Sequence, residues 1–407
     1  HFRGLKTPLL IGGATTSRAH TAVKIAPYYD GPVIYVPDAS RSVAIMQSLL
    51  TPEQKDQYIL DVEKDYARAR EQHANKKGVK LLSLEEARLN KSKLQFDKTY
   101  TPKVPKFIGK RIFKNIDLNL IAPYIDWSPF FQTWDLVGFY PAILNDPIVG
   151  ESATQVFSEA RAMLTKLINN RALVANGVVA FYPANSIDDD IEIYEDESRT
   201  KTLFTYYGLR QQSEKPKVDN IQKPNQCLSD FIAPKSSGVK DYIGVFAVTS
   251  GLGMEKYEKE FQSKSDDYSS IMFKSLADRL AEAFAEYMHE RARKDLWGYA
   301  AEENLDKEGL IKEAYKGIRP APGYPSCPDH TVKKDIFTHL RLDEIDMHLT
   351  DSFAMTPAAS VSGFYFAHPE AQYFSVDKIG DDQLKDMAKR RDVSIEYLKK
   401  WLAPNLS

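Results

Sequence analysis

A proline-rich segment late in the chain combines side chains that would bind a small molecule carrying a carboxylate and a flat ring. It reads RPAPGYPSCPDH over residues 319–330. Its four prolines fix φ and remove backbone donors, which predicts a stiff, extended loop. Arg319 would clamp a carboxylate through paired hydrogen bonds, Gly323 would let a ligand approach the backbone, and Tyr324 would stack on a ring. A rigid surface crossing explains the composition equally well.

A second group of polar residues follows helical spacing. Asp278, Glu282, Glu286 and His289 are four, four and three residues apart, which predicts one face of a long helix over 267–296. A solvated polar face is the default interpretation. Glu286 and His289 have the spacing of a di-iron ligand pair, but a bundle site needs two such pairs on facing helices. We therefore predict no metal site.

Other candidate groups have weaker signals. Asp126 lies in an aromatic-rich turn, where a carboxylate must find a donor. The pair Asp189 and Asp190 favours a turn before the next strand. Cys327 lies three residues before His330, but side chains so close on a proline-stiffened loop rarely align as nucleophile and base, so we predict no nucleophile there.

The elements that must position these residues show no strict strand–helix alternation. This favours an α+β domain with a twisted antiparallel sheet flanked by helices. Periodicity and capping predict helices at 154–168, 267–296, 381–389 and 394–402, and strands at 177–182, 191–194, 201–207, 241–248, 363–366 and 373–376.

The N-terminal region follows a different pattern. Strands at 7–11 and 33–36, each followed by helical sequence, indicate part of a parallel α/β (Rossmann-like) sheet. Two strands are too few for a doubly wound domain, so we expect a truncated remnant. The turn GGATTS at 12–17 lacks the GK[ST] ending of a P-loop, which favours a packing turn. We expect boundaries at 1–76, a linker at 77–100, and a second domain at 101–407.

Composition narrows the function classes. Charged residues make up 27% of the 407 residues, and the net charge of −2 argues against a nucleic-acid partner. No apolar run approaches the ~20 residues of a membrane helix. Two cysteines indicate a reducing compartment, here the cytoplasm, without a disulfide framework. The chain starts at His1 and has no signal-peptide pattern, so we expect a piece of a longer polypeptide.

Several long motifs, in order, resemble the activation domain of cobalamin-dependent methionine synthase. They are YIDWSPFF at 124–131, FYPAN at 181–185, DDIEIY at 189–194, ADRLAEAF at 277–284, the loop at 319–330 and WLAPNL at 401–406. The resemblance covers the chain from about residue 100 to 406. It implies a module that binds S-adenosylmethionine and presents its methyl group for reductive methylation of oxidised cobalamin. The enzyme as a whole would methylate homocysteine from methyltetrahydrofolate.

The resemblance also assigns residues. It implies that Asp126 binds the ligand's amino group, that Arg319 binds its carboxylate, and that Asp278 belongs to a surface meeting the cobalamin domain. The full set of implied S-adenosylmethionine contacts is Asp126, Glu282, Arg319, Ala321, Gly323, Tyr324, Tyr373 and Phe374. Core packing is the alternative for the last two, and no side chain is implied to be catalytic.

For cobalamin itself, the resemblance implies one contact, Ala39, in the N-terminal remnant. The family's cobalt-ligating motif, Asp-x-His-x-x-Gly, is missing from the sequence, so we expect no tight cobalamin binding by this chain alone. The implied partners are the cobalamin domain of the same polypeptide and flavodoxin or a flavoprotein reductase. We expect no membrane partner and no zinc site in this chain. The alternatives are a stand-alone S-adenosylmethionine-dependent methyltransferase and a docking module for a reductase.

Overall fold

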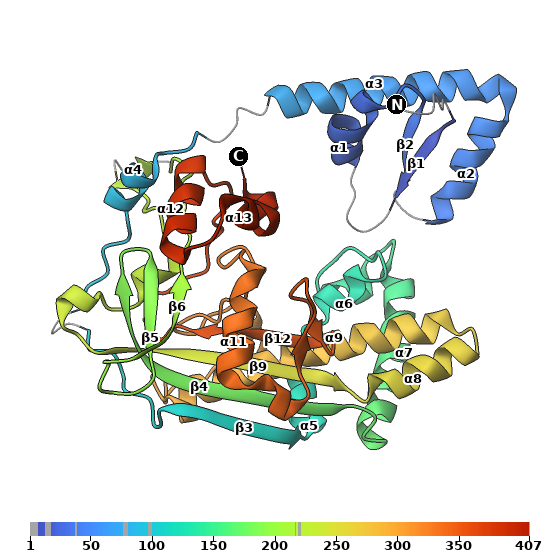
Figure 1. Cartoon of the computed structure of the whole chain (residues 1–407). Helices are drawn as coiled ribbons and strands as arrows, with labels where there is room; N and C mark the ends of the chain where they lie inside the picture. Colours follow the sequence, from blue (N-terminus) through green and yellow to red (C-terminus); the bar gives the residue numbers. More distant parts are fainter. Residues whose placement is uncertain are drawn as a thin grey trace. The chain divides into compact units, whose positions relative to one another are not determined.

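The computed structural model describes residues 7–12, 18–36, 39–75, 80–96, 100–215, 217–218 and 221–406. The chain divides into two compact units, His1–Lys80 and Leu81–Ser407. Figure 1 shows both units.

The first unit is a small α/β arrangement. Strands β1 (Leu9–Gly12) and β2 (Val33–Val36) pair in parallel, as predicted. The connection between them is helical, and two further helices follow: α1 (Arg18–His20), η1 (Thr21–Ile25), η2 (Ala26–Tyr28), α2 (Ala39–Leu50) and α3 (Pro52–Asn75). Tyr66 of α3 is buried against Ala22 and Ala69, and its hydroxyl accepts a hydrogen bond from the backbone N–H of Tyr35 at 2.8 Å.

The second unit is built on an antiparallel sheet, which confirms the predicted α+β class. Its strand order is β12–β9–β4–β5–β6, and β3 pairs with β4 beside this path. The strands are β3 (Gly109–Ile116), β4 (Val174–Ile187), β5 (Asp190–Tyr194), β6 (Thr202–Tyr207), β9 (Asp241–Leu252) and β12 (Ser360–Tyr365). The long central strands carry apolar residues on both faces, because both faces are covered.

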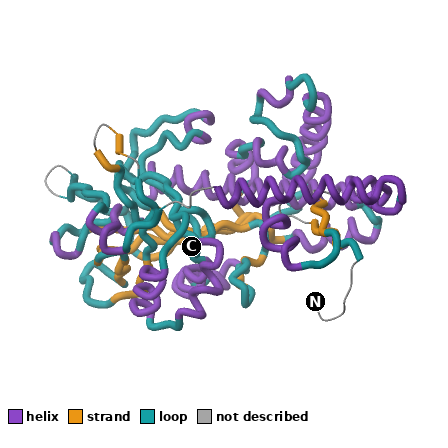
Figure 2. The backbone as a smooth tube through the Cα atoms, turned by 90° about the horizontal axis from the view of Figure 1, so that it is seen from above, coloured by secondary structure: helices purple, strands orange, loops and turns teal. Residues whose placement is uncertain are grey.

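Alternate residues of β4 point into two separate cores. Val179 and Phe181 pack under α5 (Leu118–Ile121), α6 (Ser128–Gln132), α7 (Gly150–Asn169) and α9 (Asp267–Arg291). Val178 and Ala180 pack under α11 (Lys333–Leu340) and η9 (Leu342–Ile345). Figure 2 shows helices on both sides of these strands. The sheet therefore forms the middle layer, with α9 lying along one face.

Shorter elements complete the unit. Helices α12 (Asp381–Arg391) and α13 (Ile395–Leu402) form a third apolar cluster, and Ser394 caps α13 by accepting the N–H of Tyr397 at 3.1 Å, as predicted. The remaining elements are α4 (Leu84–Leu89), η3 (Ala122–Tyr124), η4 (Ala142–Asn145), β7 (Lys217–Val218), β8 (Ile221–Gln222), η5 (Leu228–Phe231), η6 (Lys235–Ser237), α8 (Met254–Ser263), η7 (Ala292–Leu296), α10 (Lys307–Ile311), η8 (His330–Val332), β10 (His348–Leu349), β11 (Met355–Thr356) and η10 (Ala403–Asn405).

Two expectations about elements differ from the structure. The predicted strand at 373–376 is wrong: this segment is an ordered loop, in which the N–H of Val376 donates to the carbonyl of Pro325 at 2.9 Å. Residues from 81 onward belong to the second unit although we expected a linker to 100. Arg88 of α4 forms ion pairs with Asp189 and Asp386 at 2.7 and 2.9 Å, which fasten this segment to the sheet and to α12.

Candidate functional site

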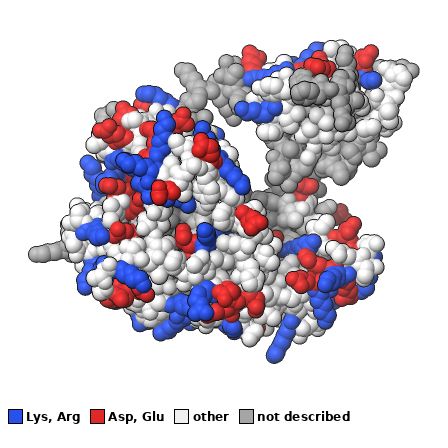
Figure 3. All heavy atoms as spheres, in the orientation of Figure 1, with Lys and Arg blue, Asp and Glu red and all other residues white. Residues whose placement is uncertain are grey.

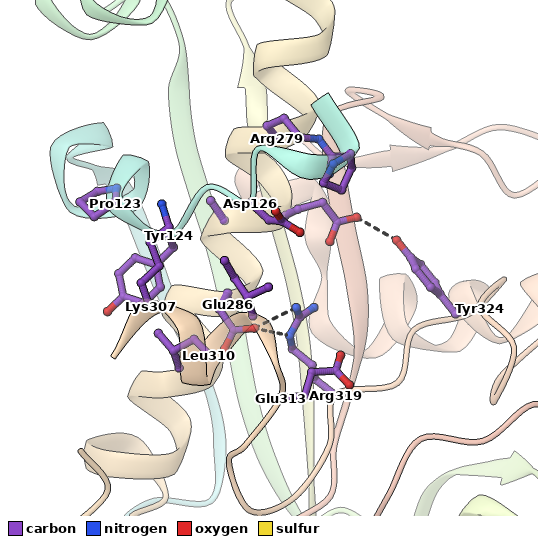
Figure 4. A pocket seen from close by; sticks show the side chains of 14 residues that line it. Pro123, Tyr124, Asp126, Arg279, Glu286, Lys307, Leu310, Glu313, Arg319 and Tyr324 are labelled. Carbon is purple, nitrogen blue, oxygen red and sulfur yellow. Dashed lines mark hydrogen bonds and ion pairs between the residues drawn. The ribbon is translucent and has the colours of Figure 1, made fainter. Parts of the chain in front are cut away.

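Two adjoining cavities lie on the second unit between α9 and the proline-rich loop. Their volumes are about 510 and 410 Å³. Both are lined by Glu282, Glu313, Arg319 and Tyr324. The larger one, shown in Figure 4, also reaches Asp126 at the turn before α6. Side chains from three distant parts of the sequence therefore meet around one space.

The start of the proline-rich loop is fixed to the edge strand β12. Ile318 exchanges backbone hydrogen bonds of 3.0 and 2.9 Å with Phe366, and the N–H of Phe364 donates to the carbonyl of Pro320 at 3.0 Å. The N–H of Arg319 donates to the hydroxyl of Tyr373 at 3.0 Å. Because the backbone is held on both sides, Arg319 projects from a rigid base.

The tip of the loop is a tight turn that requires glycine. Gly323 has φ +99° and donates its N–H to the carbonyl of Cys327 at 2.7 Å. A Cβ at this position would lie 2.3 Å from the His330 ring. Gly323 lines neither of the two cavities, so the turn and the His330 contact explain this glycine without a ligand.

The guanidinium of Arg319 is paired with Glu286 of α9. Its Nε and Nη2 donate to Oε2 of Glu286 at 3.3 and 3.0 Å (Figure 4). Burial acts to lower the pKa of Arg319, but Glu286, together with Tyr373, Tyr315 and Glu282, outweighs it and the pKa is raised. Arg319 therefore keeps its charge in a largely enclosed place.

The two carboxylates that were predicted as ligand contacts, Asp126 and Glu282, face the larger cavity. Glu282 accepts a hydrogen bond from the hydroxyl of Tyr324 at 2.8 Å. Burial and the neighbouring Glu282 raise the pKa of Tyr324 to about 12, so its hydroxyl stays protonated and donates. Asp126 accepts the N–H of Ser128 at 2.9 Å through one oxygen and still lines the cavity.

The remaining predicted contacts lie around the smaller cavity. Ala321, Tyr373 and Phe374 line it together with Arg319 and Tyr324. Seven of the eight predicted ligand contacts thus line one or the other cavity, and Gly323 shapes the loop beside them. The cobalamin contact, Ala39, is the first residue of α2, and its side chain lies outside the described residues.

The predicted solvated face of α9 is wrong for two of its four members. Glu286 is buried, and His289 is fully buried with its ring stacked on Tyr365 at 5.2 Å. Burial, followed by the nearby Arg293, lowers the pKa of His289 well below its usual value, so it is neutral. Asp278, in contrast, is exposed.

Sequence reasoning missed several residues of the larger cavity. Arg279 and Lys307 add positive charge to its lining, and Glu313 adds a carboxylate whose pKa is raised by burial. Glu313 follows α10 with φ 55°, in an irregular segment with no periodicity. Only its position six residues before Arg319 hinted at the site.

Candidates that we set aside occupy structural positions. Cys327 is buried, and burial raises the pKa of its thiol to about 12, so no thiolate forms near neutral pH. Asp189 is buried in ion pairs with Arg88 and Arg210, both at 2.7 Å. These contacts hold α4 and the 208–212 segment in place.

In the described part of the chain, the distribution of surface charge, the metal-ligating residue types and the helix composition do not point to a particular further ligand or partner. Acidic and basic side chains are interspersed over the face seen in Figure 3. Within the ranges that the structure describes, no cluster of three or more His, Cys, Asp or Glu side chains is arranged to hold a metal ion. Across the same residues, no helix has both the length and the apolar composition needed to cross a bilayer.

Comparison with known proteins places this site in a family. Residues 117–392 match the family described as "Vitamin B12 dependent methionine synthase, activation domain". A solved structure, described as the MetH reactivation domain bound to AdoHcy, is 50% identical in sequence with a TM-score of 0.75. The match covers 80% of this chain and 99% of that one.

The matched range includes every predicted contact around the two cavities, from Asp126 to Phe374. The second unit, with its antiparallel sheet flanked by helices, is similar in fold to that structure. This chain belongs to the family of activation domains of vitamin B12 dependent methionine synthase.

Proposed function

We propose that the second unit binds S-adenosylmethionine in the two adjoining cavities and presents its methyl group for reductive methylation of cobalamin. Arg319 holds the ligand's carboxylate, Asp126 its ammonium group, and Glu282 a further polar group. The aromatic rings of Tyr373 and Phe374 enclose the ligand. The observation that carries this proposal is the convergence of Asp126, Glu282 and Arg319 on one cavity.

The charges of the lining complement this ligand. S-adenosylmethionine carries a sulfonium and an ammonium beside one carboxylate, so it is a net cation at neutral pH. The larger cavity is lined by four carboxylates (Asp126, Glu282, Glu286 and Glu313) and three cations (Arg279, Lys307 and Arg319). Opposite charges at short range favour the ionised forms of both partners, and a site with excess negative charge favours a cation.

The contribution of this chain is orientation. The cobalamin of the intact enzyme supplies the metal-centred nucleophile, so no side-chain nucleophile is required. Holding the sulfonium methyl group in line with its acceptor lowers the barrier by removing rotational and translational freedom. The buried, protonated thiol of Cys327 and the neutral, buried His289 agree with such a role.

We also propose that the chain works within a larger methionine synthase. Residues 1–76 would be the C-terminal part of its cobalamin domain, and residues 101–407 the activation domain. The parallel strands β1 and β2 support the first assignment. The residues present do not fit cobalamin by themselves, since the cobalt-ligating histidine motif is missing. Reduced flavodoxin or a flavoprotein reductase would donate the electron, in the cytoplasm.

Titration calorimetry with S-adenosylmethionine tests the binding site. A charge-assisted hydrogen bond contributes roughly 1.5–3 kcal/mol, so Arg319→Ala should weaken binding by about ten- to a hundredfold. Arg319→Lys should weaken it too, because an ammonium group cannot reproduce the planar fork of donors. Equal affinity of Arg319→Ala and the parent protein, with unchanged circular dichroism, would rule the assignment out.

A further inference from the structure

One edge of the Arg319 guanidinium is held by a carboxylate of the protein itself. Nε and Nη2 donate to Oε2 of Glu286 at 3.3 and 3.0 Å, and both side chains are largely buried, 19% and 12% exposed. Nη1 has no hydrogen-bond partner among the residues that the structure describes. A guanidinium is a rigid planar fork, so two bonds on one edge fix the direction of the opposite edge.

Glu286 is in turn held from its other side. Its Oε1 lies 3.5 Å from Nη1 of Arg293, which is fully buried. Nε of Arg293 donates to both oxygens of Glu303 at 2.8 and 3.1 Å, and its guanidinium lies 4.2 Å from the centre of the Tyr315 ring. Arg319, Glu286, Arg293 and Glu303 thus form a buried chain of alternating charges that is neutral as a whole.

Glu282, Glu286 and Arg293 all come from one helical stretch, in which η7 directly follows α9. Glu282 and Glu286 are one turn apart and face the cavity, while Arg293 lies two turns beyond Glu286, in η7. A carboxylate that lies between two guanidinium groups is fixed more firmly than one with a single partner. In Figure 4, Glu286 lies on one side of Arg319 and Tyr324 on the other. Arg319 lines both cavities, whereas Glu286 lines only the larger one.

We propose that Glu286 is a positioning residue, which fixes the guanidinium of Arg319 so that its Nη1 side meets the ligand's carboxylate. The proposal rests on the proposed function, in which Arg319 binds that carboxylate. Arg319 has enough donors for both partners, since its five N–H groups serve two edges. If Glu286 instead competed with the ligand for Arg319, its removal would strengthen binding, so the two roles predict opposite signs.

The test compares two ligands that differ only in the group that Arg319 is proposed to bind. Calorimetry is run with S-adenosylmethionine and with decarboxylated S-adenosylmethionine, on the parent chain and on Glu286→Gln and Glu286→Ala. Glu286→Gln should lose roughly five- to fiftyfold in affinity for S-adenosylmethionine, and Glu286→Ala more, because the amide retains one acceptor. Affinity for the decarboxylated ligand should fall by a clearly smaller factor, because only the attraction between the Glu286 charge and the cationic ligand is lost.

A matched control is Glu260→Gln on α8, which makes the same chemical change in an exposed ion pair with Lys264. It should bind both ligands as the parent does. Equal losses for both ligands in Glu286→Gln would indicate general damage and overturn the proposal, as would tighter binding of S-adenosylmethionine. If the parent binds S-adenosylmethionine and the decarboxylated ligand equally, the proposed role of Arg319 fails; if it binds neither, the proposed function fails.

Discussion

At the scale of single residues, Asp126 both stabilises a turn and lines the larger cavity. One oxygen accepts the N–H of Ser128 and so stabilises the turn before α6, while the carboxylate still lines the larger cavity. Glu282 similarly accepts the hydroxyl of Tyr324 and lines both cavities. A local hydrogen bond therefore does not remove a carboxylate from a site; it orients the group for a second partner.

Both carboxylates are expected to contribute to binding of a cationic ligand. Asp126→Asn and Glu282→Gln each remove a negative charge with little change of shape. We expect each to weaken binding of S-adenosylmethionine by about three- to thirtyfold in calorimetry, because a charged acceptor is replaced by a neutral one. S-adenosylhomocysteine, which lacks the sulfonium charge, should bind the parent less tightly. Unchanged affinity in both variants would place the ligand elsewhere.

A suitable control for these variants is Glu302→Gln. Glu302 is exposed and lines neither cavity. Its affinity for S-adenosylmethionine should equal that of the parent. A loss there as large as in Asp126→Asn would mean that overall charge, and not a local contact, governs binding.

At the scale of elements, long segments with strong patterns could be predicted and short or irregular ones could not. The strands at 177–182 and 241–248 and the helix at 267–296 were confirmed, because each carries continuous apolar or period-3.6 sequence. Strand β3 was missed, since none of the residues in its sequence GKRIFKNI is buried and it lies at the side of the sheet. Tyr373 and Phe374 lie in a loop whose order comes from contacts with residues far away in sequence.

The residues of the site also divide into those that could be predicted from the sequence and those that could not. Asp126, Glu282 and Arg319 were singled out by their types and by their motifs, and all three line one cavity. Glu286 was assigned to a solvated face, because spacing along a helix does not show how far its neighbours enclose it. Its burial depends on Arg293 and Arg319, which no local pattern brings together. Residues fixed by long-range ion pairs are therefore the part of a site that sequence alone conceals.

The beginning of β9 contains a buried carboxylate with consequences for stability. Asp241 accepts N–H groups of Ala233 and Tyr242 at 2.8 and 2.7 Å, and Arg199 donates to its carbonyl at 2.8 Å. Burial raises the pKa of Asp241 to about 7, against the opposing effects of these donors and of Arg199. The folded state thus binds this proton more tightly than the unfolded state, where the pKa is near 3.8.

The sign of the pH dependence follows from linkage. The contribution of Asp241 to stability is fully present below about pH 4 and is lost as the pH rises through about 7. Asp241→Asn cannot titrate. The free energy of unfolding of the parent, relative to this variant, should therefore fall between pH 5 and pH 8 in urea titrations. Parallel profiles for the two proteins would contradict the assignment, and Glu302→Gln, an exposed change, should parallel the parent.

At the scale of the whole molecule, the chain combines two units of different class. The first has a parallel pair of strands, and the second has an antiparallel sheet with its own cores on both faces. All the residues proposed to bind S-adenosylmethionine lie in the second unit. Ligand binding by the second unit is therefore separable from any cobalamin chemistry of the first.

This separation leads to the last prediction, which concerns cobalamin. In open parallel sheets, ligands bind beyond the carboxyl ends of several strands, and the first unit pairs only β1 with β2 among its described residues. The sequence also lacks the Asp-x-His-x-x-Gly motif whose histidine would ligate the cobalt. We expect the chain, mixed with methylcobalamin and passed through gel filtration, to elute without the cofactor's visible absorption. The same sample should still bind S-adenosylmethionine in calorimetry, which shows that the second unit is folded. Stoichiometric elution of cobalamin with the protein would mean that the described strands and helices suffice to hold the cofactor without the histidine ligand.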